Sequence, residues 1–338
     1  MGKKKKGGKG KKSAPAVPSA LPEEYLKNYS LACKLYGCEP CACVKNGLET
    51  EEGGAVNYMF IDEPVGPAGV RAAVSALLGK HPDMKGGPYS KFTSLHFARC
   101  NAQADGAAAV AEVLRVGGEA LPIANVQFVD CRVGERGCQA LGAALGNGGN
   151  NTLKRLIVKF DETVGDRGAS VLARSLRMNG AIEVLRLEYC NIGAAGARNI
   201  AKILEYGGTQ LKELSLIGNP IGPDGLAYIA KSLAKNQILT TLQLKDCGVG
   251  NTQEDLEGLE ALARALATNQ TLEMLHFEEN FIGDEGAEVF AAMEEDAKKN
   301  LKNLWIEFEG GSAAAFAAAS ITATGKKGKK GKKKKKKK

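Results

Sequence analysis

Several features that mark common protein classes are scarce or missing in this sequence of 338 residues. No apolar run approaches the roughly 20 residues that a membrane-spanning helix requires. No G-x-x-x-x-G-K-[ST] motif is present, and no G-x-G-x-x-G follows a predicted strand, so nucleotide binding is not indicated. The basic N-terminus "MGKKKKGGKGKK" has no apolar segment behind it, so a secretory signal peptide is not expected. The nine cysteines are therefore expected to be reduced thiols of a cytosolic or nuclear protein.

Acidic residues are missing from both ends of the chain. Residues 1–20 carry seven lysines and residues 321–338 carry eleven, in each case without an aspartate or a glutamate. Subtracting these 18 lysines from the net charge of +8 leaves about −10 for residues 21–320. The sequence thus predicts an acidic folded body between two basic segments, whose low complexity predicts disorder.

An internal repeat of the form L-x-x-L-x-L-x-x-C/N accounts for most of the chain between the tails. Full copies begin at Phe92, Ile123, Leu153, Ile182, Leu211, Leu239 and Leu272, and a further copy begins at Leu301. Tyr58 and Phe60 fit the apolar strand positions of a degenerate earlier copy. Equivalent residues of five consecutive copies, 131, 161, 190, 219 and 247, lie 28 to 30 residues apart, a period typical of solenoid repeats.

Each copy continues with a segment that has the pattern apolar-Gly-x-x-Gly, as in "IGAAGARNIAKIL". Within that segment, Gly196, Ile200 and Leu204 follow the spacing of one helix face. Leu185 and Leu187, which precede it, alternate as the buried residues of a strand do. Each unit is therefore predicted to be a strand, a turn and a helix.

These motifs resemble the ribonuclease-inhibitor class of leucine-rich repeats, and the resemblance covers roughly residues 55–309. The resemblance implies an α/β solenoid shaped as a right-handed horseshoe, with parallel strands on the concave face and helices on the convex face. Stacking is also required physically, because a single strand–helix unit cannot bury its apolar face alone.

The predicted organisation has four parts and two insertions. Residues 1–20 form a lysine-rich tail, residues 21–54 a helical N-terminal cap, residues 55–310 the leucine-rich-repeat domain, and residues 311–338 an alanine-rich linker with a second lysine-rich tail. The insertions at residues 79–91 and 251–255 are expected to enlarge loops, where binding specificity often resides.

Cys190 is the first candidate for chemistry, because it stands beside a glycine-spaced loop as a thiol nucleophile could. However, cysteine recurs at this position of several repeats, and asparagine replaces it at Asn219 and Asn280. A residue that recurs in every unit is expected to pack between repeats and to hydrogen-bond the backbone of the turn. The sequence therefore predicts no catalytic residue.

A cysteine cluster near the N-terminus is the second candidate. Cys33, Cys38, Cys41 and Cys43 could hold zinc through four thiolates. The pair Cys41-x-Cys43 is a poor chelate spacing, and a second C-x-x-C motif is missing, so buried cap cysteines are the preferred interpretation. We expect no metal and no cofactor.

The concave face carries the predicted partner-binding residues. In L-x-x-L-x-L the residue between the last two apolar positions points away from the core, and the residue before the final Cys or Asn lies beside it. The predicted protein-binding residues are Arg99, Phe160, Arg186, Tyr189, His276, Glu278, Glu279 and Trp305. Arginine and aromatic residues in adjacent repeats have the composition of interface hot spots. Trp305 is equally consistent with covering the exposed last repeat.

The tails are predicted to bind a polyanion, because lysine is a hydrated point charge that favours diffuse negative surfaces. The predicted residues are Lys3, Lys4, Lys5, Lys6, Lys332, Lys333, Lys334, Lys335, Lys336, Lys337 and Lys338. Candidate partners are acidic protein tails such as those of tubulin, nucleic acid and anionic lipid. No aromatic residue interleaves the lysines, which argues against stacking on bases. A solubilising or nuclear-import tail is the alternative.

The sequence as a whole predicts a non-enzymatic scaffold that is part of a larger complex. Lysine-glycine ends around such repeats resemble axonemal leucine-rich-repeat proteins of cilia and flagella, including subunits of radial-spoke and dynein-regulatory assemblies. One alternative is a nuclear or nucleolar protein with RNA-binding tails. A second is a GTPase regulator, because the Ran GTPase-activating protein uses this repeat class, although that family has an acidic C-terminal region where this chain has lysines.

Overall fold

A computed structural model of the protein describes residues 19–48, 57–250, 253–292 and 303–305. The lysines predicted to bind polyanions and the alanine-rich segment lie outside these described residues. Within the described part, no helix combines the length and the apolar character that crossing a membrane requires.

Strands and helices alternate along the described chain. The helices are α1 (Pro22–Tyr36), α2 (Ala42–Asn46), α3 (Gly66–Leu78), α4 (Gln103–Gly117), the 3-10 turn η1 (Gly118–Ala120), α5 (Gly134–Leu145), α6 (Gly165–Leu176), α7 (Ala194–Leu204), α8 (Gly222–Leu233), α9 (Gln253–Thr268) and α10 (Gly283–Ala291). The strands are β1 (Tyr58–Ile61), β2 (Ser94–Ala98), β3 (Asn125–Val129), β4 (Arg155–Lys159), β5 (Val184–Glu188), β6 (Glu213–Ser215), β7 (Thr241–Gln243), β8 (Met274–His276) and β9 (Asn303–Trp305).

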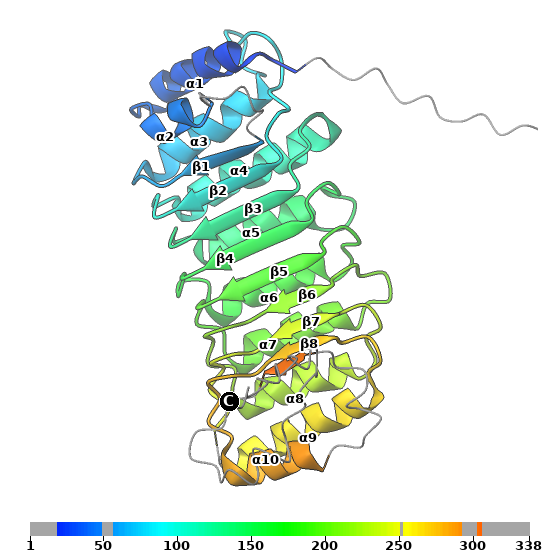
Figure 1. Cartoon of the computed structure of the whole chain (residues 1–338). Helices are drawn as coiled ribbons and strands as arrows, with labels where there is room; N and C mark the ends of the chain where they lie inside the picture. Colours follow the sequence, from blue (N-terminus) through cyan, green and yellow to red (C-terminus); the bar gives the residue numbers. More distant parts are fainter. Residues whose placement is uncertain (1–18, 49–56, 251–252, 293–302, 306–338) are drawn as a thin grey trace, which may run out of the picture.

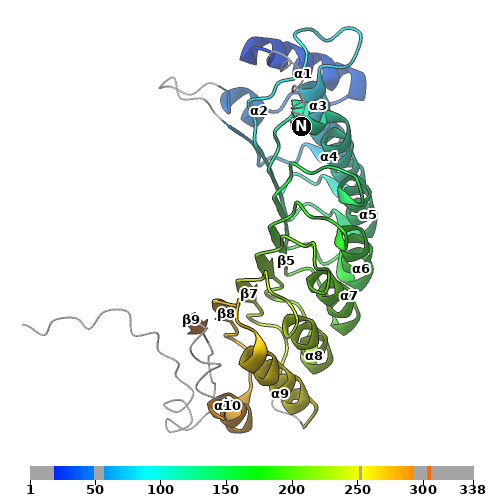
Figure 2. The ribbon, with the colours of Figure 1, turned by 90° about the vertical axis from the view of Figure 1, so that its right-hand side faces the viewer.

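The strands β1 to β9 form one parallel sheet in the order of the sequence. Equivalent repeat positions lie opposite each other, so that Leu185 of β5 pairs with Leu156 of β4 and with Leu214 of β6. Figure 1 looks onto this sheet, and Figure 2 shows the strands along the concave side of a curved ribbon whose convex side is formed by the helices. The predicted solenoid, with strands on the concave face and helices on the convex face, is confirmed.

The first repeat differs from the prediction in register. Tyr58 and Phe60 do not occupy the apolar core positions: they are 51% and 46% exposed and face outward. The buried residues of β1 are Met59 and Ile61, which pair with the core residues of β2. The prediction for Tyr58 and Phe60 was therefore wrong by one residue, which in a strand turns every side chain to the other face.

The length of the turn after β1 explains this error. Gly66 at the start of α3 follows the last inward residue, Ile61, by five positions, whereas Gly134 follows Phe128 by six. An alignment that assumes equal turns therefore places the strand one residue too early. Because all four residues of β1 are apolar, alternation of polarity gives no correction.

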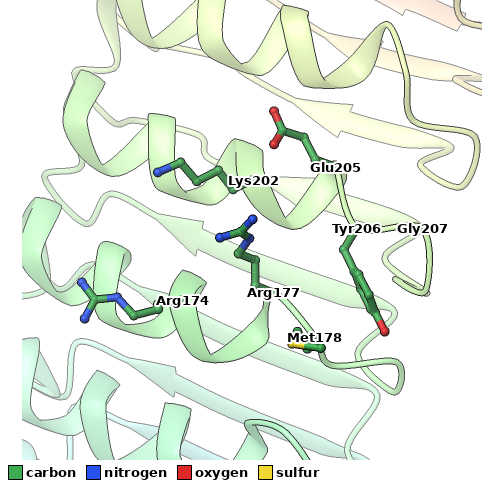
Figure 3. Close-up of a pocket in the computed structure, with 7 residues that line it drawn as sticks. All are labelled: Arg174, Arg177, Met178, Lys202, Glu205, Tyr206 and Gly207. Carbon is green, nitrogen blue, oxygen red and sulfur yellow. The ribbon is translucent and has the colours of Figure 1, made fainter.

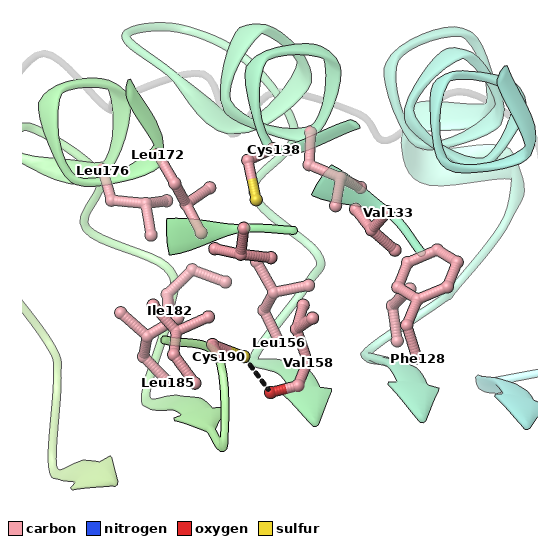
Figure 4. Packing of buried hydrophobic residues seen from close by; sticks show 14 of the residues in the cluster. Phe128, Val133, Cys138, Leu156, Val158, Leu172, Leu176, Ile182, Leu185 and Cys190 are labelled. Atoms are coloured by element: carbon pink, nitrogen blue, oxygen red, sulfur yellow. Dashed lines mark hydrogen bonds between the residues drawn. The ribbon is translucent and has the colours of Figure 1, made fainter. Parts of the chain in front are cut away.

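The core is a continuous stack of side chains between the sheet and the helices. The central strand positions Leu95, Val126, Leu156, Leu185, Leu214, Leu242 and Leu275 are each at most 1% exposed. Helix residues such as Leu172 and Leu176 of α6 pack against this stack (Figure 4). Burial of each large aliphatic side chain contributes about 1.5 to 3 kcal/mol, so the stacking of repeats is the main source of stability.

A buried asparagine closes the turn after β6. The Asn219 amide donates to the carbonyl oxygens of Leu187 and Leu216, both at 2.7 Å. Its side-chain oxygen accepts from the backbone N–H groups of Cys190 and Ile192, both at 3.0 Å. The side chain thus joins two consecutive repeats, as the sequence predicted.

The same repeat position is filled by asparagine or cysteine elsewhere. Asn280 donates to the carbonyl oxygen of Leu244 at 2.7 Å, in the repeat before its own. Cysteine replaces part of this network: Cys190 Sγ donates to the carbonyl oxygen of Val158 at 3.5 Å (Figure 4). Cys190 is fully buried, so its role in the fold is the structural one that its recurrence predicted.

A second column of buried asparagines lies where each helix returns to the next strand, and the sequence analysis did not identify it. Asn150, Asn179, Asn236 and Asn269 are at most 8% exposed. Their amide groups donate to the carbonyl oxygens of Leu114, Leu145, Leu204 and Leu233 at 2.9, 2.7, 2.8 and 2.8 Å. These carbonyls belong to the last turns of helices, where backbone acceptors lack partners within the helix. Each asparagine therefore caps the helix of one repeat and orders the entry to the next.

The two insertions have different outcomes. Residues 79–93 form an irregular connection between α3 and β2, as predicted for residues 79–91. The predicted loop at residues 251–255 is wrong in its second half, because α9 begins at Gln253.

Two helices precede the first repeat. Tyr25 and Tyr29 of α1 are buried, and α1 packs against α3. The ring of Tyr89, in the long connection after α3, lies 5.0 Å from that of Tyr25. An aromatic cluster therefore helps to hold the cap to the repeats.

Candidate partner-binding site on the concave face

Where the chain leaves the sheet after a strand, one residue of the turn has an unusual backbone conformation. We call residues 99, 130, 160, 189, 218, 246 and 279 the strand-exit positions, and all have φ between 46° and 68°. In this left-handed region a residue other than glycine costs roughly 1 to 2 kcal/mol. Bulky side chains at strand-exit positions therefore oppose the backbone preference, and such a cost is a reason to look for a function.

Phe160 and Tyr189 occupy two neighbouring strand-exit positions and stack on each other. Their ring centroids are 4.9 Å apart and the rings are inclined by 9°. Phe160 is 53% exposed, although it is one of the largest apolar side chains of the protein. The backbone N–H of Phe160 donates to the carbonyl oxygen of Glu188 at 2.9 Å, which fixes the position of the pair. A stacked pair in which Phe160 is exposed and Tyr189 half-buried is well suited to contact a protein partner.

Gly218 supports the other side of the Tyr189 ring. Its φ of 68° suits glycine, and a Cβ atom at this position would overlap the ring of Tyr189. Phe160, Tyr189 and Gly218 thus form consecutive steps of one edge, with the tyrosine ring between a ring and a bare backbone. Glycine is needed here both for the backbone and for the close approach.

Replacing Gly218 by alanine should lower the free energy of unfolding by about 2 kcal/mol and displace the Tyr189 ring. Chemical denaturation measures the first effect, and near-ultraviolet circular dichroism of tyrosine measures the second. Gly207→Ala is the matched control, because a Cβ atom there has nothing within 4 Å. Equal stability of the two variants would contradict the close packing of Tyr189 on Gly218.

Ion pairs surround the aromatic pair on the concave face. Lys159 Nζ lies 2.6 Å from Glu188 Oε2, and Ser215 Oγ donates to Glu188 Oε1 at 2.9 Å. Arg186, a predicted binding residue, donates from Nε to Glu213 Oε1 at 2.5 Å. Lys159, Glu188 and Glu213 could not be predicted from the sequence pattern, because each owes its role to a neighbour about one repeat away.

A second charged group lies further along the same edge. Lys245 Nζ is 2.7 Å from Glu279 Oε1, and this hydrogen bond raises the pKa of Lys245. His276 Nδ1 and Glu278 Oε1 are 3.1 Å apart on and beside β8. The predicted binding residues His276, Glu278 and Glu279 therefore lie close to one another at this part of the concave face.

Two other predicted residues do not belong to these groups. Arg99 pairs with Asp62 at the N-terminal end of the sheet. Trp305 is in β9, where its backbone pairs with His276, and its side chain lies outside the described residues. The choice between partner binding and end-capping for Trp305 therefore stays a prediction.

Tyr58 and Phe60 are additional concave residues, which the register error concealed. Both are exposed on β1, and the Tyr58 ring lies 6.3 Å from the ring of His96 on β2. Burial lowers the pKa of His96, so this histidine is neutral at physiological pH. These residues give the first two strands an aromatic surface, separate from the edge around Phe160.

The loop beside Cys190 does not offer a phosphate-binding site. The carboxylate of Asp166 accepts hydrogen bonds from the backbone N–H groups of Gly193 and Gly196, both at 2.8 Å. Asp166 belongs to the preceding repeat and therefore occupies the helix N-terminus that a phosphate would need. Burial raises the pKa of the Cys190 thiol well above its ordinary value, which disfavours the thiolate needed for nucleophilic attack.

A hollow of about 540 Å³ lies between the carboxyl ends of α6 and α7 (Figure 3). It is lined by Arg174, Arg177, Met178, Lys202, Glu205, Tyr206 and Gly207. Three of these side chains are cationic and one is anionic, so the hollow suits an anionic group. It contains none of the predicted binding residues and no serine, cysteine or histidine that could serve as a nucleophile or base.

Comparison with protein families agrees with the repeat architecture. Residues 182–201, 209–230 and 268–291 match a family model described as "Leucine Rich repeat". With the strand–helix units and the parallel sheet described above, this match supports a leucine-rich-repeat solenoid.

Two solved structures are similar to this chain at low identity. One is described as Leiomodin-1 Actin-Binding Site 2 (ABS2), with 18% identity and a TM-score of 0.36 over 44% of this chain and 83% of that one. The other is a yeast complex of Rad7 and Elc1, with 13% identity and a TM-score of 0.35 over 87% of this chain and 90% of that one. No curated protein matches the chain. These likenesses concern the repeat fold alone.

Proposed function

We propose that this protein is a non-enzymatic scaffold whose concave edge around Phe160 and Tyr189 binds a protein partner. The observation that carries the proposal is the stacked aromatic pair, with Phe160 exposed and Tyr189 half-buried, at two strand-exit positions where the backbone favours glycine. A folded protein gains little by keeping such rings in water, whereas an interface buries them. The nearby pairs Lys159–Glu188 and Arg186–Glu213 give the partner a defined polar rim.

The lysine-rich ends are the second part of the proposed function. They carry 18 lysines without a single acidic residue, next to a body with a formal charge of about −10. Such segments bind surfaces with a high density of negative charge, and the glutamate-rich tails of tubulin are a surface of this kind. We therefore assign the protein to the ciliary or flagellar axoneme, as a structural component of a radial-spoke or dynein-regulatory type of assembly.

Capture of partners by the full-length protein tests the concave site. Wild type and a Phe160→Glu variant are each purified from the source cell with their bound proteins, and the recovered proteins are quantified. Tyr228→Glu is the control, because Tyr228 is 38% exposed on α8, on the convex side. A partner that is lost with Phe160→Glu and retained with Tyr228→Glu supports the site. Equal recovery with all three proteins contradicts it.

Removal of residues 1–18 and 311–338, which leaves the buried Ala20 in place, should weaken binding to microtubules at least tenfold at low salt. The physical reason is the loss of multiple lysine contacts to an anionic surface, and the wild-type affinity should fall steeply as salt is raised. Co-sedimentation over a salt series measures both effects. Microtubules from which subtilisin has removed the acidic tubulin tails should bind the full-length protein as weakly as intact microtubules bind the shortened one.

Binding to single-stranded RNA under the same conditions distinguishes the nuclear alternative. If removal of the tails abolishes RNA binding but leaves microtubule binding unchanged, the axonemal assignment is wrong. Localisation of a tagged copy in the source cell then tests the remaining step, because a scaffold of the axoneme must be found along cilia or flagella.

A further inference from the structure

Three side chains with metal-binding atoms meet where the cap joins the first repeat. The ligand atoms of Cys41, Cys43 and Glu63 all lie within 4.8 Å of one another. Cys43 Sγ donates a hydrogen bond to Glu63 Oε1 at 2.9 Å. Cys41 is buried, while Cys43 and Glu63 are half-buried. The group is thus enclosed on one side and open to solvent on the other.

The backbone around this group is held by ordered elements. Cys41 precedes α2, and its backbone N–H donates to the hydroxyl oxygen of Tyr29 at 2.8 Å. Tyr29 is 1% exposed in α1, so this contact anchors the start of α2 to the cap. Glu63 comes from the turn between β1 and α3. Two separate parts of the fold therefore supply the three side chains.

We propose that Cys41, Cys43 and Glu63 bind one zinc ion, with solvent as the fourth ligand, and that the ion ties the cap to the first repeat. Binding releases two thiol protons to solvent and forms two zinc–sulfur bonds and one zinc–oxygen bond. Thiolates select a soft or borderline ion, and the carboxylate favours Zn²⁺ over Cu⁺. At zinc–sulfur distances of about 2.3 Å the two sulfurs of a tetrahedral site lie roughly 3.8 Å apart, a spacing compatible with ligand atoms that all lie within 4.8 Å of one another.

The ligand set differs from the four-cysteine alternative that the sequence left open. Cys33 and Cys38 do not belong to the group of converging atoms, and a glutamate 20 residues after Cys43 does. The short spacing Cys41-x-Cys43 is compatible with a shared ion, because the start of α2 turns both side chains toward Glu63.

Titration of the reduced full-length protein with Co²⁺ and Zn²⁺ tests the proposal. Cobalt should produce the near-ultraviolet sulfur-to-cobalt charge-transfer band with one equivalent per chain, and zinc should displace it. Zinc in excess of its dissociation constant should also raise the Tm by about 5 °C, and a chelator should reverse this rise.

Three variants locate the site. Cys43→Ser and Glu63→Gln should each lose the tight equivalent of cobalt and the rise in Tm, with unchanged far-ultraviolet circular dichroism. Cys38→Ser is the matched control in the same cap and should bind cobalt as wild type does. No charge-transfer band at one equivalent would overturn the proposal, and so would equal binding by Glu63→Gln or loss of binding in Cys38→Ser.

Discussion

Replacing Asn219 by alanine is expected to lower the free energy of unfolding by about 3 to 5 kcal/mol. The Asn219 side chain is 1% exposed and makes hydrogen bonds to Leu187, Leu216, Cys190 and Ile192. Alanine would leave two buried carbonyls and two buried N–H groups without these partners. Each buried polar group without a partner costs about 1 to 3 kcal/mol of stability. Local relaxation of the structure recovers part of the summed cost.

A cysteine at the same position should cost less than alanine. Cysteine occupies the equivalent place at Cys190 and Cys247, where each Sγ donates to a carbonyl of the preceding repeat. Asn219→Cys therefore retains one contact between repeats and fills most of the volume, so its stability should lie between wild type and Asn219→Ala.

Urea denaturation followed by far-ultraviolet circular dichroism measures these differences. Asn147→Ala is the control, because Asn147 is exposed in the connection after α5, and its cost should stay within about 0.5 kcal/mol. Each repeat contacts only its neighbours, so Asn219→Ala should also broaden the transition as the two halves of the solenoid uncouple. A loss below about 1 kcal/mol for Asn219→Ala would show that this network does not couple the repeats.

Much of the fold is predictable from the sequence because its information is local and repeated. The period of 28 to 30 residues identifies the units, and the change from alternate spacing to helical spacing divides each unit into strand and helix. The role of Asn219 follows from the same column of residues. Repetition also separates structural residues such as Cys190 from those that vary at outward positions, such as Phe160 and Tyr189.

The errors and omissions arise where units differ or touch. The turn after β1 is one residue shorter than its equivalents, and this shift concealed Tyr58 and Phe60. The column of Asn150, Asn179, Asn236 and Asn269 was visible as an asparagine three residues before the first apolar position of four units. It was missed because its partners are helix carbonyls of the preceding unit.

Contacts between side chains one repeat apart depend on how the units stack, which pattern analysis does not specify. Glu213 pairs with Arg186 across 27 positions of sequence, and Asp166 holds the loop of α7 across a similar distance. Glu63 meets the cap cysteines only because the cap folds back on the first repeat. The sequence offers many acidic residues at similar spacing, so the way the repeats stack has to be known before the partner of a given basic or polar group can be named.

Replacing Phe160 and Tyr189 together by alanine is expected to weaken binding of the captured partner by about 10² to 10³-fold. Each single variant should lose about 30 to 100-fold, and the double variant should lose less than the product of the two because the rings stack at 4.9 Å. Isothermal titration calorimetry of the wild type, both single variants and the double variant measures the four affinities of this double-mutant cycle. Tyr228→Ala on the convex side should leave the affinity within twofold.

Glycine at these two positions separates a binding role from a structural one. Phe160 and Tyr189 have φ values of 54°, so Phe160→Gly and Tyr189→Gly relieve about 1 kcal/mol of backbone cost at each site. This relief of backbone cost offsets part of the stacking energy that is lost with the ring. The free energy of unfolding should therefore stay within about 1 kcal/mol of wild type. Affinity should nevertheless fall as far as in the alanine variants. If the glycine variants unfold easily, or if they bind the partner normally, the rings serve the fold rather than the interface.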